Sequence, residues 1–589
     1  MRRVRSLGPI ALVIAATLAL TLLLQERYHH RILTLVLLWA TMGLAWNIIS
    51  GYAGQISFGH QAFFGIGAYT TVLLILSVRL TPWAGMLVGA AAAAVAAIVI
   101  GVPTFRLGGI YFALATLAYP LIFRILMDFL GYQEVPIPLA TSRPGFYMQF
   151  ADPRAYDLLS LAVFAVTLLM SHWIENSRLG YSLRALKENQ HVAEAMGVDT
   201  FRCKMVAYVL SAIPAALAGA IYAHAILFVV TPDAVFGIQV IVQTLVLSLV
   251  GGAGSKWGPV LGAALMVPVS ETLDATIGDV LPGIHGVVYG LALILIMLFA
   301  PEGLYWRGHA LLRRRHAAPG SGRRGIAAPS SPSRPVRATA VGGPLLEVAG
   351  VSVSFLGLRA VADVSFSVAP GEILGIIGPN GAGKTTLFNA LNGFLASARG
   401  TVRFRGERID GLAPNAICRR GIGRTFQVPR TFAHLSVVEN VMVGAFARER
   451  HRGPARELAL QALAFVGLES HADRPPVGLT TLDLRLLELS RCVATGADLI
   501  LLDEPLAGLS RDGVTAILGL IGRLRAAGFT VLLIEHTIRA LLQIADRLVV
   551  LDHGSLIAAG LPGDVTKNPL VIEAYLGRRW LRHVETLRT

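Results

Sequence analysis

Apolar residues dominate the first half of the chain in long runs, and the second half alternates shorter apolar runs with polar turns. Several long runs fall short of the roughly 20 residues that a membrane-spanning helix needs, so some are expected to be broken or re-entrant. Hydropathy predicts roughly eight to ten spans, drawn from the stretches Pro9–Leu24, Ile32–Ile49, Phe63–Leu76, Trp83–Ile100, Ile110–Leu126, Leu158–Trp173, Met205–Val230, Val235–Val250, Val260–Val269 and Ile284–Phe299.

The composition agrees with a membrane domain. The hydrophobic fraction is 54%, charged residues make up only 15%, and the mean hydropathy is +0.62, values that exclude an ordinary soluble protein. The net charge is +15, but the arginines gather where membrane topology requires them, and no nucleic-acid partner is predicted. The three cysteines are far apart and form no C-x-x-C pair, so neither a metal site nor a disulfide framework is expected.

The basic residues also predict how the spans are oriented. Positive charge is concentrated at Arg2, Arg3 and Arg5, in the loop Asn176–Lys204, and after the last span at Arg307–Arg315. All three regions are expected on the cytoplasmic side, which implies an even number of spans. The first apolar stretch follows basic residues as a signal peptide would, but it lacks a small-residue cleavage site, which favours an uncleaved span.

Polar residues occur inside the apolar half in the stretch Gly51–Tyr69 and at the pair Arg124 and Asp128. Gly51–Tyr69 mixes many glycines with glutamine and histidine. Close helix packing through small residues and a broken helix lining a translocation route both remain open for this stretch. His60 is interpreted as a hydrogen-bond partner in helix packing, and Arg124 is expected to pair with Asp128, four residues along the same predicted helix.

From Leu345 the pattern is that of a soluble α/β domain. Strands are predicted at Leu345–Phe355, Ala362–Val368, Glu372–Ile377, Thr401–Phe404, Leu499–Leu502, Thr530–Ile534 and Arg547–Leu551, with a mainly helical insertion that ends near Thr495. Residues 307–344, rich in Arg, Pro, Gly, Ser and Ala, are predicted to be a basic flexible linker. Contact of this linker with anionic membrane lipid is the alternative.

A glycine-rich run follows the strand Glu372–Ile377 and opens a helix near Lys384. Its spacing, G-x-x-x-x-G-K-[ST], is that of a nucleotide phosphate cradle, formed by Gly378, Pro379, Asn380, Gly381, Ala382, Gly383, Lys384, Thr385 and Thr386. Backbone N–H groups of such a loop surround phosphate oxygens, and the helix N-terminus adds positive partial charge. Lys384 is expected to reach the β- and γ-phosphates, and the hydroxyl of Thr385 suits Mg²⁺.

Four further polar residues complete the predicted ATP site. The strand Leu499–Leu502 ends in two carboxylates, of which Asp503 is expected to hold Mg²⁺ and Glu504 to polarise the attacking water. Gln427 is expected to sense the γ-phosphate and Mg²⁺ from a loop, and His536 to contact the γ-phosphate. The predicted fold class is therefore an α-helical polytopic membrane domain followed by an α/β P-loop NTPase domain.

The order and spacing of these motifs resemble the ATP-binding cassette of ABC transporters. The segments Arg419–Gln427, Leu435–Val441 and Asn568–Gly577 look like one ATPase subunit of bacterial branched-chain amino acid importers. The membrane half is similar to a permease of the same systems through Gly51–Tyr69 and Arg184–Gly197. The resemblance implies a permease domain at 1–306 fused through the linker 307–344 to an ABC ATP-binding domain at 345–589, with ATP and Mg²⁺ as cofactors.

The resemblance also implies further site residues. Phe355 would stack on adenine, and Val361 would lie beneath the ribose. The polar cytoplasmic segment between the spans would be a coupling helix that receives force from the ATPase, and Gly197 is placed to end it. The coupling residues expected there are Glu188, Ala193, Glu194 and Gly197.

The sequence departs from the family pattern in the signature segment. Where the family has Leu-Ser-Tyr-Gly-Gln or a close variant, this chain has Leu479, Thr480, Thr481, Leu482 and Asp483. Thr480 still offers a hydroxyl, but Leu482 replaces a glycine and Asp483 adds negative charge, so closure on ATP should weaken. The segment Gly131–Phe150 also lacks the Thr-Gly-Gly run expected in amino acid permeases of this kind, which leaves the solute open.

These observations predict ATP-driven import of branched-chain amino acids or related small solutes. The expected partners are a second permease subunit, a second ATPase subunit that forms a cassette heterodimer, an extracytoplasmic solute-binding protein, and membrane lipid. The expected location is the cytoplasmic (inner) membrane, with the ATPase domain in the cytoplasm. The alternatives are an ATP-binding regulatory or channel-like membrane protein, and an ABC transporter for another solute such as urea, an amide or an aromatic compound.

Overall fold

A computed structural model describes residues 2–138, 143–277, 280, 283–316, 343–355, 358–395 and 399–576. The chain divides into two compact units, and each is described by itself. Unit 1 comprises Met1–Leu183 and Phe201–Ser321, and unit 2 comprises Arg184–Thr200 and Gly322–Thr589. Most of the predicted linker, residues 317–342, lies outside the described residues. Its first residues, up to His316, belong to helix α14 (Leu304–His316).

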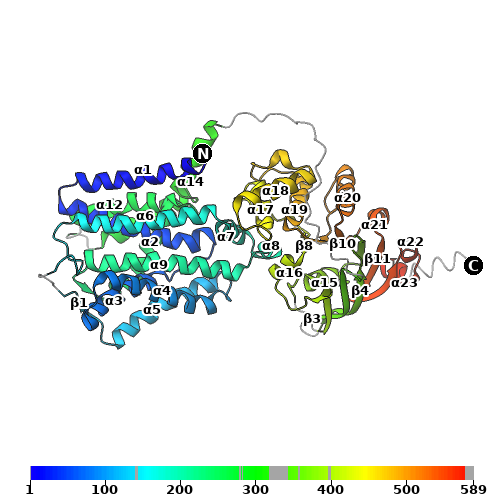
Figure 1. The fold of residues 1–589 in the computed structure, drawn as a ribbon, viewed down its shortest axis with the longest axis horizontal. Coiled ribbons are helices and arrows are strands. Elements are labelled where there is room, and N and C mark those ends of the chain that lie inside the picture. Colours follow the sequence, from blue (N-terminus) through cyan, green and yellow to red (C-terminus); the bar gives the residue numbers. More distant parts are fainter. Residues whose placement is uncertain are drawn as a thin grey trace, which may run out of the picture. The chain divides into compact units, whose positions relative to one another are not determined.

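Unit 1 is a bundle of long apolar helices that run along a common direction (Figure 1). Nine helices among the described residues are long and apolar enough to cross a membrane, within the range predicted from hydropathy but not the even number that the orientation argument implies. The apolar part of α1, Leu7–Leu23, is shorter than these nine. The elements of this unit are α1 (Arg2–Leu23), α2 (Arg27–Trp46), the π-helix η1 (Asn47–Tyr52), α3 (His60–Val78), α4 (Pro82–Thr104), α5 (Ile110–Phe129), β1 (Val135–Pro136), α6 (Arg154–Asn176), α9 (Thr200–Ile226), β2 (Val229–Val230), α10 (Pro232–Phe236), α11 (Ile238–Gly251), α12 (Trp257–Ile277), α13 (Ile284–Phe299) and α14.

The structure shows both a helix break and close packing in the glycine-rich stretch, whereas a role in lining a translocation route stays a prediction. The helix is broken, since the π-helical turn η1 ends at Tyr52 and α3 begins only at His60. The small residues are also packed closely: a Cβ added at Gly67 would stand 1.9 Å from the carbonyl oxygen of Ala216. A π-helical turn followed by irregular backbone requires surrounding protein at membrane depth, and the buried side chains of η1 show that it has this cover.

The structure confirms one polar contact in unit 1 and corrects another. His60 is fully buried, and its ring nitrogens lie 3.1 Å from the hydroxyls of Ser57 and Ser211, as expected for a packing partner. Arg124, however, pairs with Asp233 at 2.9 Å and not with Asp128. The reason is tertiary, because α10 packs beside α5 and places Asp233 within reach of Arg124.

Unit 2 is built on two sheets. The larger has the strand order β12-β11-β5-β10-β9-β8, in which β12 is antiparallel and the others are parallel. The smaller, β4-β3-β6-β7, is antiparallel. The strands are β3 (Leu346–Phe355), β4 (Leu358–Val368), β5 (Ile373–Ile377), β6 (Arg399–Phe404), β7 (Glu407–Arg408), β8 (Ile422–Arg424), β9 (Leu499–Asp503), β10 (Thr530–Ile534), β11 (Arg547–Asp552) and β12 (Ser555–Gly560).

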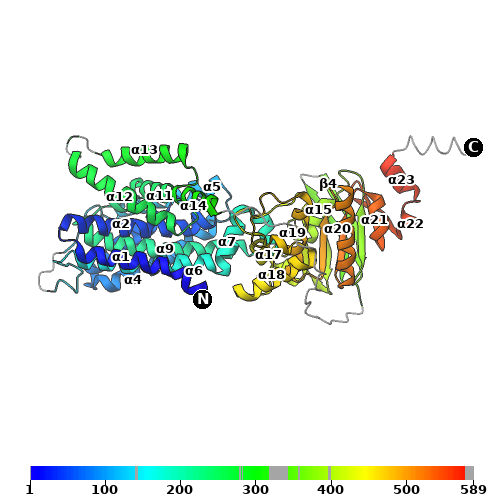
Figure 2. The ribbon, with the colours of Figure 1, turned by 90° about the horizontal axis from the view of Figure 1, so that it is seen from above.

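Helices cover these sheets and form the predicted insertion. Helices α17, α18 and α19 lie together as one group, visible in Figure 1 and again in Figure 2. The helices of unit 2 outside the coupling segment are α15 (Lys384–Leu391), α16 (Pro414–Arg420), α17 (Val437–Ala445), α18 (Arg452–Val466), the short 3-10 helix η2 (Glu469–His471), α19 (Thr481–Thr495), α20 (Arg511–Ala526), α21 (Ile538–Ile544), α22 (Pro562–Val565) and α23 (Pro569–Leu576).

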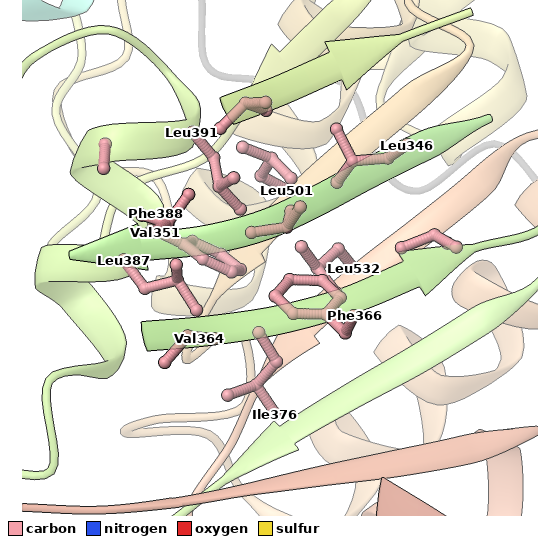
Figure 3. Packing of buried hydrophobic residues seen from close by; sticks show 14 of the residues in the cluster. Leu346, Val351, Val364, Phe366, Ile376, Leu387, Phe388, Leu391, Leu501 and Leu532 are labelled. Carbon is pink, nitrogen blue, oxygen red and sulfur yellow. The ribbon is translucent and has the colours of Figure 1, made fainter. Parts of the chain in front are cut away.

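The hydrophobic core of unit 2 lies between the two sheets and helix α15. Figure 3 shows Val351 and Val364 of the small sheet facing Leu501 and Leu532 of the large sheet, with Phe388 of α15 beside them. All five side chains are almost completely buried. Burial of this apolar area is the main favourable contribution to folding, and it fixes β5 and β9, whose carboxyl ends carry the candidate site.

The predicted coupling helix is two helices. Helix α7 (Arg178–Glu188) ends where Asn189 accepts a hydrogen bond from the backbone of Val192 and caps α8 (Gln190–Ala195). Asparagine favours such a helix start, which explains the break. Gly197 follows α8 with a positive φ of +85°, in keeping with its predicted position at the helix end.

Candidate nucleotide-binding site

The phosphate cradle connects β5 to α15, and two of its glycines have no substitute. Gly378 has φ +153°, and a Cβ there would meet the carbonyl oxygen of Leu551 at 2.1 Å. Gly383 has φ +93°, and its Cβ would lie 2.3 Å from the carbonyl oxygen of Ala360. Glycine alone accepts both the backbone conformation and the contact, so the loop is held against its neighbours.

A half-open cavity of about 440 Å³ lies over this loop. Its walls are Asn380–Thr386 with Ala360, Gln427, Glu504 and His536. The last three come from loops that follow β8, β9 and β10, which are parallel to β5 in one sheet. Since carboxyl ends of parallel strands meet at one edge, residues far apart in the sequence gather around the cradle.

Lys384 is buried at the first position of α15. Its Nζ donates to the carbonyl oxygens of Gly378 at 2.7 Å and Pro379 at 2.9 Å. Burial lowers the pKa of Lys384, and the nearby carboxylates of Glu504 and Asp503 oppose this shift. The ammonium group is thus already positioned at the cradle by its own backbone.

Glu504 has the most constrained geometry of the site. Its φ of +48° is uncommon for a residue with a side chain. Its two carboxylate oxygens are both held, Oε1 by Nε2 of His536 at 2.7 Å and Oε2 by Nε2 of Gln427 at 2.9 Å. Unusual backbone angles of this kind cluster at functional sites.

Asp503 lies at the end of β9 and is almost fully buried. Its Oδ2 lies 3.3 Å from Nη2 of Arg424. Among the described residues, Oδ1 has no hydrogen-bond partner. Burial raises the pKa of Asp503, and the charge of Arg424 opposes this.

Of the two residues predicted to contact the nucleoside, Phe355 at the base and Val361 at the ribose, only Phe355 is exposed. Phe355, at the end of β3, is 42% exposed and remains free to stack on a ring. Val361 is fully buried, faces Val353 in the sheet pairing, and belongs to the core. The prediction that Val361 lies beneath the ribose is therefore corrected: alternate residues of a strand face opposite sides, and it is Ala360 that lines the cavity.

The side chains of Thr480 and Asp483 in the signature segment are hydrogen-bonded to each other. Thr480 caps α19, and its hydroxyl donates to Oδ2 of Asp483 at 2.8 Å. The backbone N–H of Asp483 donates to the Thr480 hydroxyl at 3.2 Å and the backbone N–H of Thr480 donates to Oδ2 of Asp483 at 3.2 Å, and these two bonds form a capping box. The hydroxyl proton is thus directed at this chain's own carboxylate. Leu479 precedes the cap residue, and Thr481 and Leu482 are the first two residues of α19.

Within unit 2, two of the four coupling residues form hydrogen bonds with the cassette. Oε1 of Glu188 accepts the backbone N–H of His434 at 3.1 Å. The carbonyl oxygen of Gly197 accepts from Nε and Nη2 of Arg419, at 3.1 and 2.8 Å. Ala193 is fully buried beside α16, whereas Glu194 accepts hydrogen bonds from Thr200 and Gln190 of its own segment.

Sequence reasoning missed two residues that the structure places at the site. Arg424 contacts Asp503, and the hydroxyl of Tyr575, on α23, accepts the N–H of Gly378 at 2.7 Å. Both residues lie inside segments that carry the family resemblance, Arg419–Gln427 and Asn568–Gly577. Their position in these segments is the signal in the sequence that could have pointed to them.

Tyr575→Phe is expected to raise the dissociation constant for ATP about fivefold. The change removes one hydrogen bond, worth about 1 kcal/mol, and leaves the Gly378 N–H less firmly placed while the ring still fills its site. Nucleotide binding followed by a fluorescent ATP analogue measures the effect, and the melting temperature checks the fold. Unchanged ATP affinity in a folded variant would contradict a positioning role for Tyr575.

Comparisons with known proteins find matches to both halves of the chain. Residues 28–297 match the family model for the branched-chain amino acid transport system / permease component, residues 361–507 match the ABC transporter model, and residues 555–580 match that of the branched-chain amino acid ATP-binding cassette transporter. A nucleotide-free ATP-binding cassette from an ABC transporter is 31% identical with a TM-score of 0.37, covering 40% of this chain and 99% of that chain.

Two curated relatives are similar to the second half of the chain. The high-affinity branched-chain amino acid transport ATP-binding protein LivG of Escherichia coli K12 is 40% identical over 250 residues, which are 40% of this chain and 98% of the relative. The corresponding protein BraF of Pseudomonas aeruginosa gives the same figures. The predicted fold class is confirmed, and the cassette is a transport-coupled ATPase. The chain belongs to the branched-chain amino acid family of ABC transporters, and it carries the permease and the ATPase in one polypeptide.

Proposed function

We propose that this chain is the permease and ATPase subunit of an importer for branched-chain amino acids or closely related solutes. The similarity of the cassette to LivG and BraF, whose names state that transport, carries the proposal. The permease family match over residues 28–297 supports it. Urea, amides and aromatic compounds remain alternative solutes, because Gly131–Phe150 lacks a Thr-Gly-Gly run.

The site residues fit ATP with Mg²⁺. The cradle loop Gly378–Thr386 offers backbone N–H groups and Lys384 to the phosphates, and exposed Phe355 offers a face to adenine. Asp503, Thr385 and Gln427 would hold Mg²⁺, and the buried, unpartnered Oδ1 of Asp503 is the oxygen that the described residues leave for it. When bound, the ion neutralises the negative charge that develops on the phosphates.

The chain's own residues then account for hydrolysis. Glu504 orients and polarises a water molecule as general base, and His536 and Gln427 fix both of its oxygens. His536 lines the same cavity as Glu504 and would contact the γ-phosphate there. Lys384 stabilises the charge that spreads over the transferred phosphoryl group. Because these groups are placed before ATP arrives, little reorganisation is needed.

The coupling segment transmits this cycle to the spans. Glu188 and Gly197 are bound to the cassette through the backbone N–H of His434 and the guanidinium of Arg419. Movement of those cassette residues therefore displaces α8, in which Ala193 is packed and Glu194 is tied to Thr200 at the start of α9. The span α9 receives the displacement.

The self-capped signature predicts an asymmetric assembly. In a cassette dimer the signature of one chain closes the ATP site of the other. Thr480 and Asp483 bind each other here, so the site that they face is expected to be weak. A second ATPase with an intact signature would complete the site at Lys384. The proposed partners are therefore that ATPase, a second permease and an extracytoplasmic solute-binding protein.

The proposed location is the cytoplasmic membrane, with permease residues 1–306, linker 307–344 and ATPase residues 345–589. The nine apolar helices and the permease match support a membrane protein. The cytoplasmic placement of the cassette rests on the arginine-rich ends of the spans and on its need for ATP.

Uptake into proteoliposomes tests the proposal. The complex purified through this chain, with Mg-ATP inside and a leucine-loaded binding protein outside, should accumulate radiolabelled leucine. Lys384→Ala should abolish uptake, since it removes the phosphate-binding ammonium. Uptake of urea or an amide instead of leucine would replace the solute, and ATP-driven outward flux would overturn the import direction.

A further inference from the structure

Arg424 is an unusually enclosed charge. It lies at the end of β8 with only 3% of its surface exposed. Its guanidinium carbon lies 5.9, 5.8 and 5.4 Å from the ring centroids of Phe388, Phe394 and Phe426. Aromatic faces attract such a cation, and together they restrict the guanidinium to one position.

The same guanidinium binds the carboxylate at the end of β9. Nη2 lies 3.3 Å from Oδ2 of Asp503, and Nη1 donates to Oδ1 of Asn389 at 2.7 Å. With Oδ2 engaged, Oδ1 of Asp503 is left without a partner among the described residues. Arg424 therefore engages one carboxylate oxygen of Asp503 and leaves the other without a partner.

A cavity connects this pair to the coupling segment. It has a volume of about 390 Å³, and its walls include His191 and Val192 of α8 as well as Phe394, Arg424 and Asp503. The ring of His191 meets that of Phe394 edge to face, with centroids 5.5 Å apart. Phe394 is thus in contact with the coupling segment on one side and with Arg424 on the other.

We propose that Arg424 is a positioning residue that orients Asp503 for Mg²⁺, and that Phe394 makes this orientation sensitive to the coupling segment. The inference rests on the proposed metal role of Asp503. Groups that hold metal ligands in place commonly change metal affinity 10- to 100-fold when removed. The arrangement provides a physical route from α8 to the Mg²⁺ side of the site through Phe394 and Arg424.

Arg491 is a matched control for a role in packing alone. It is also buried, its guanidinium lies 5.3 Å from the ring of Phe432, and it donates to the carbonyl oxygen of Arg430. Its carboxylate neighbour is Glu488, at 3.7 Å, and not Asp503. Loss of Arg491 removes a comparable buried cation that does not pair with Asp503.

Mg²⁺ titration of the full complex tests the inference. Binding of a fluorescent ATP analogue is measured as a function of Mg²⁺, along with analogue binding in EDTA and the melting temperature. Arg424→Met, which keeps much of the volume, is expected to raise the half-saturating Mg²⁺ concentration about tenfold with EDTA binding unchanged. Arg424→Lys, which keeps the charge but loses the fork, should show a smaller rise, and Arg491→Met should leave it unchanged.

The outcomes separate the claims. Asp503→Asn is expected to raise the half-saturating Mg²⁺ concentration. If it does not, the proposed metal role of Asp503 is wrong. If Asp503→Asn weakens it but both folded Arg424 variants match or exceed the wild-type affinity for Mg²⁺, the positioning role of Arg424 is overturned. If only Arg424→Lys folds, that variant decides alone. Phe394→Leu should raise the half-saturating Mg²⁺ concentration about two- to threefold, a part of the effect expected for Arg424→Met. If Phe394→Leu leaves this concentration unchanged, the proposed link between α8 and Asp503 is overturned.

Discussion

Glu504→Gln is expected to lower ATP turnover at least about 100-fold, because the amide cannot accept a proton from the attacking water. Both oxygens of Glu504 are held, by His536 at 2.7 Å and by Gln427 at 2.9 Å, and glutamine has the same shape as glutamate. The cradle is untouched, so ATP should bind with near wild-type affinity. Phosphate release and binding of a fluorescent ATP analogue measure the two quantities separately.

Lys384→Ala is the control, and it is expected to change ATP binding as well as turnover. It removes the ammonium group that the backbone of Gly378 and Pro379 holds at the cradle, so it should lose nucleotide binding along with turnover. A Glu504→Gln protein that still hydrolysed ATP at a substantial rate would assign the general base to another residue. A Glu504→Gln protein that lost ATP binding would show that the carboxylate supports the cradle.

The sequence was most informative where the chemistry is local. The cradle Gly378–Thr386 needs consecutive residues and a fixed spacing, so its place between β5 and α15 could be predicted. The strand Thr530–Ile534 has the predicted bounds because it is an uninterrupted apolar run in a buried parallel sheet. Both features are determined within a few residues.

Long-range packing explains the errors. Arg124 has a carboxylate four residues away, but α10 brings Asp233 closer, and no local pattern contains that information. Val361 and Ala360 differ only in which face of β4 they occupy, so an error of one residue exchanges core for cavity.

Short elements and single side-chain contacts could not be predicted from the hydrophobic pattern either. The strand β8 has only three residues, Ile422–Arg424, and carries no periodicity. Asn189 divides the coupling segment because its side chain caps α8, whereas the polar run around it favours one helix. The contacts of Tyr575 and Arg424 depend on sheet order, which places α23 near β5 and β8 beside β9.

Repairing the signature should increase the ATPase activity of this chain when it is reconstituted alone. In a homodimer, each ATP site is formed by the cradle of one chain and the signature segment Leu479–Asp483 of the other. The double change Leu482→Gly with Asp483→Gln removes a side chain from the closest approach to phosphate and a negative charge from the helix start. We expect turnover to rise about tenfold, a modest share of the 10²–10³ that a donor to developing charge can supply.

Asp483→Asn separates the two causes. Asparagine keeps an acceptor for the capping box with Thr480 but carries no charge, so a gain from this change alone would be electrostatic. The remaining gain on adding Leu482→Gly would come from backbone approach. Adding Glu504→Gln to the repaired chain should abolish the gain. If the repaired chain turned over no faster than the unaltered one, or if the unaltered chain alone already had normal turnover, the self-capped signature would not limit hydrolysis and the asymmetric heterodimer would lose its physical basis.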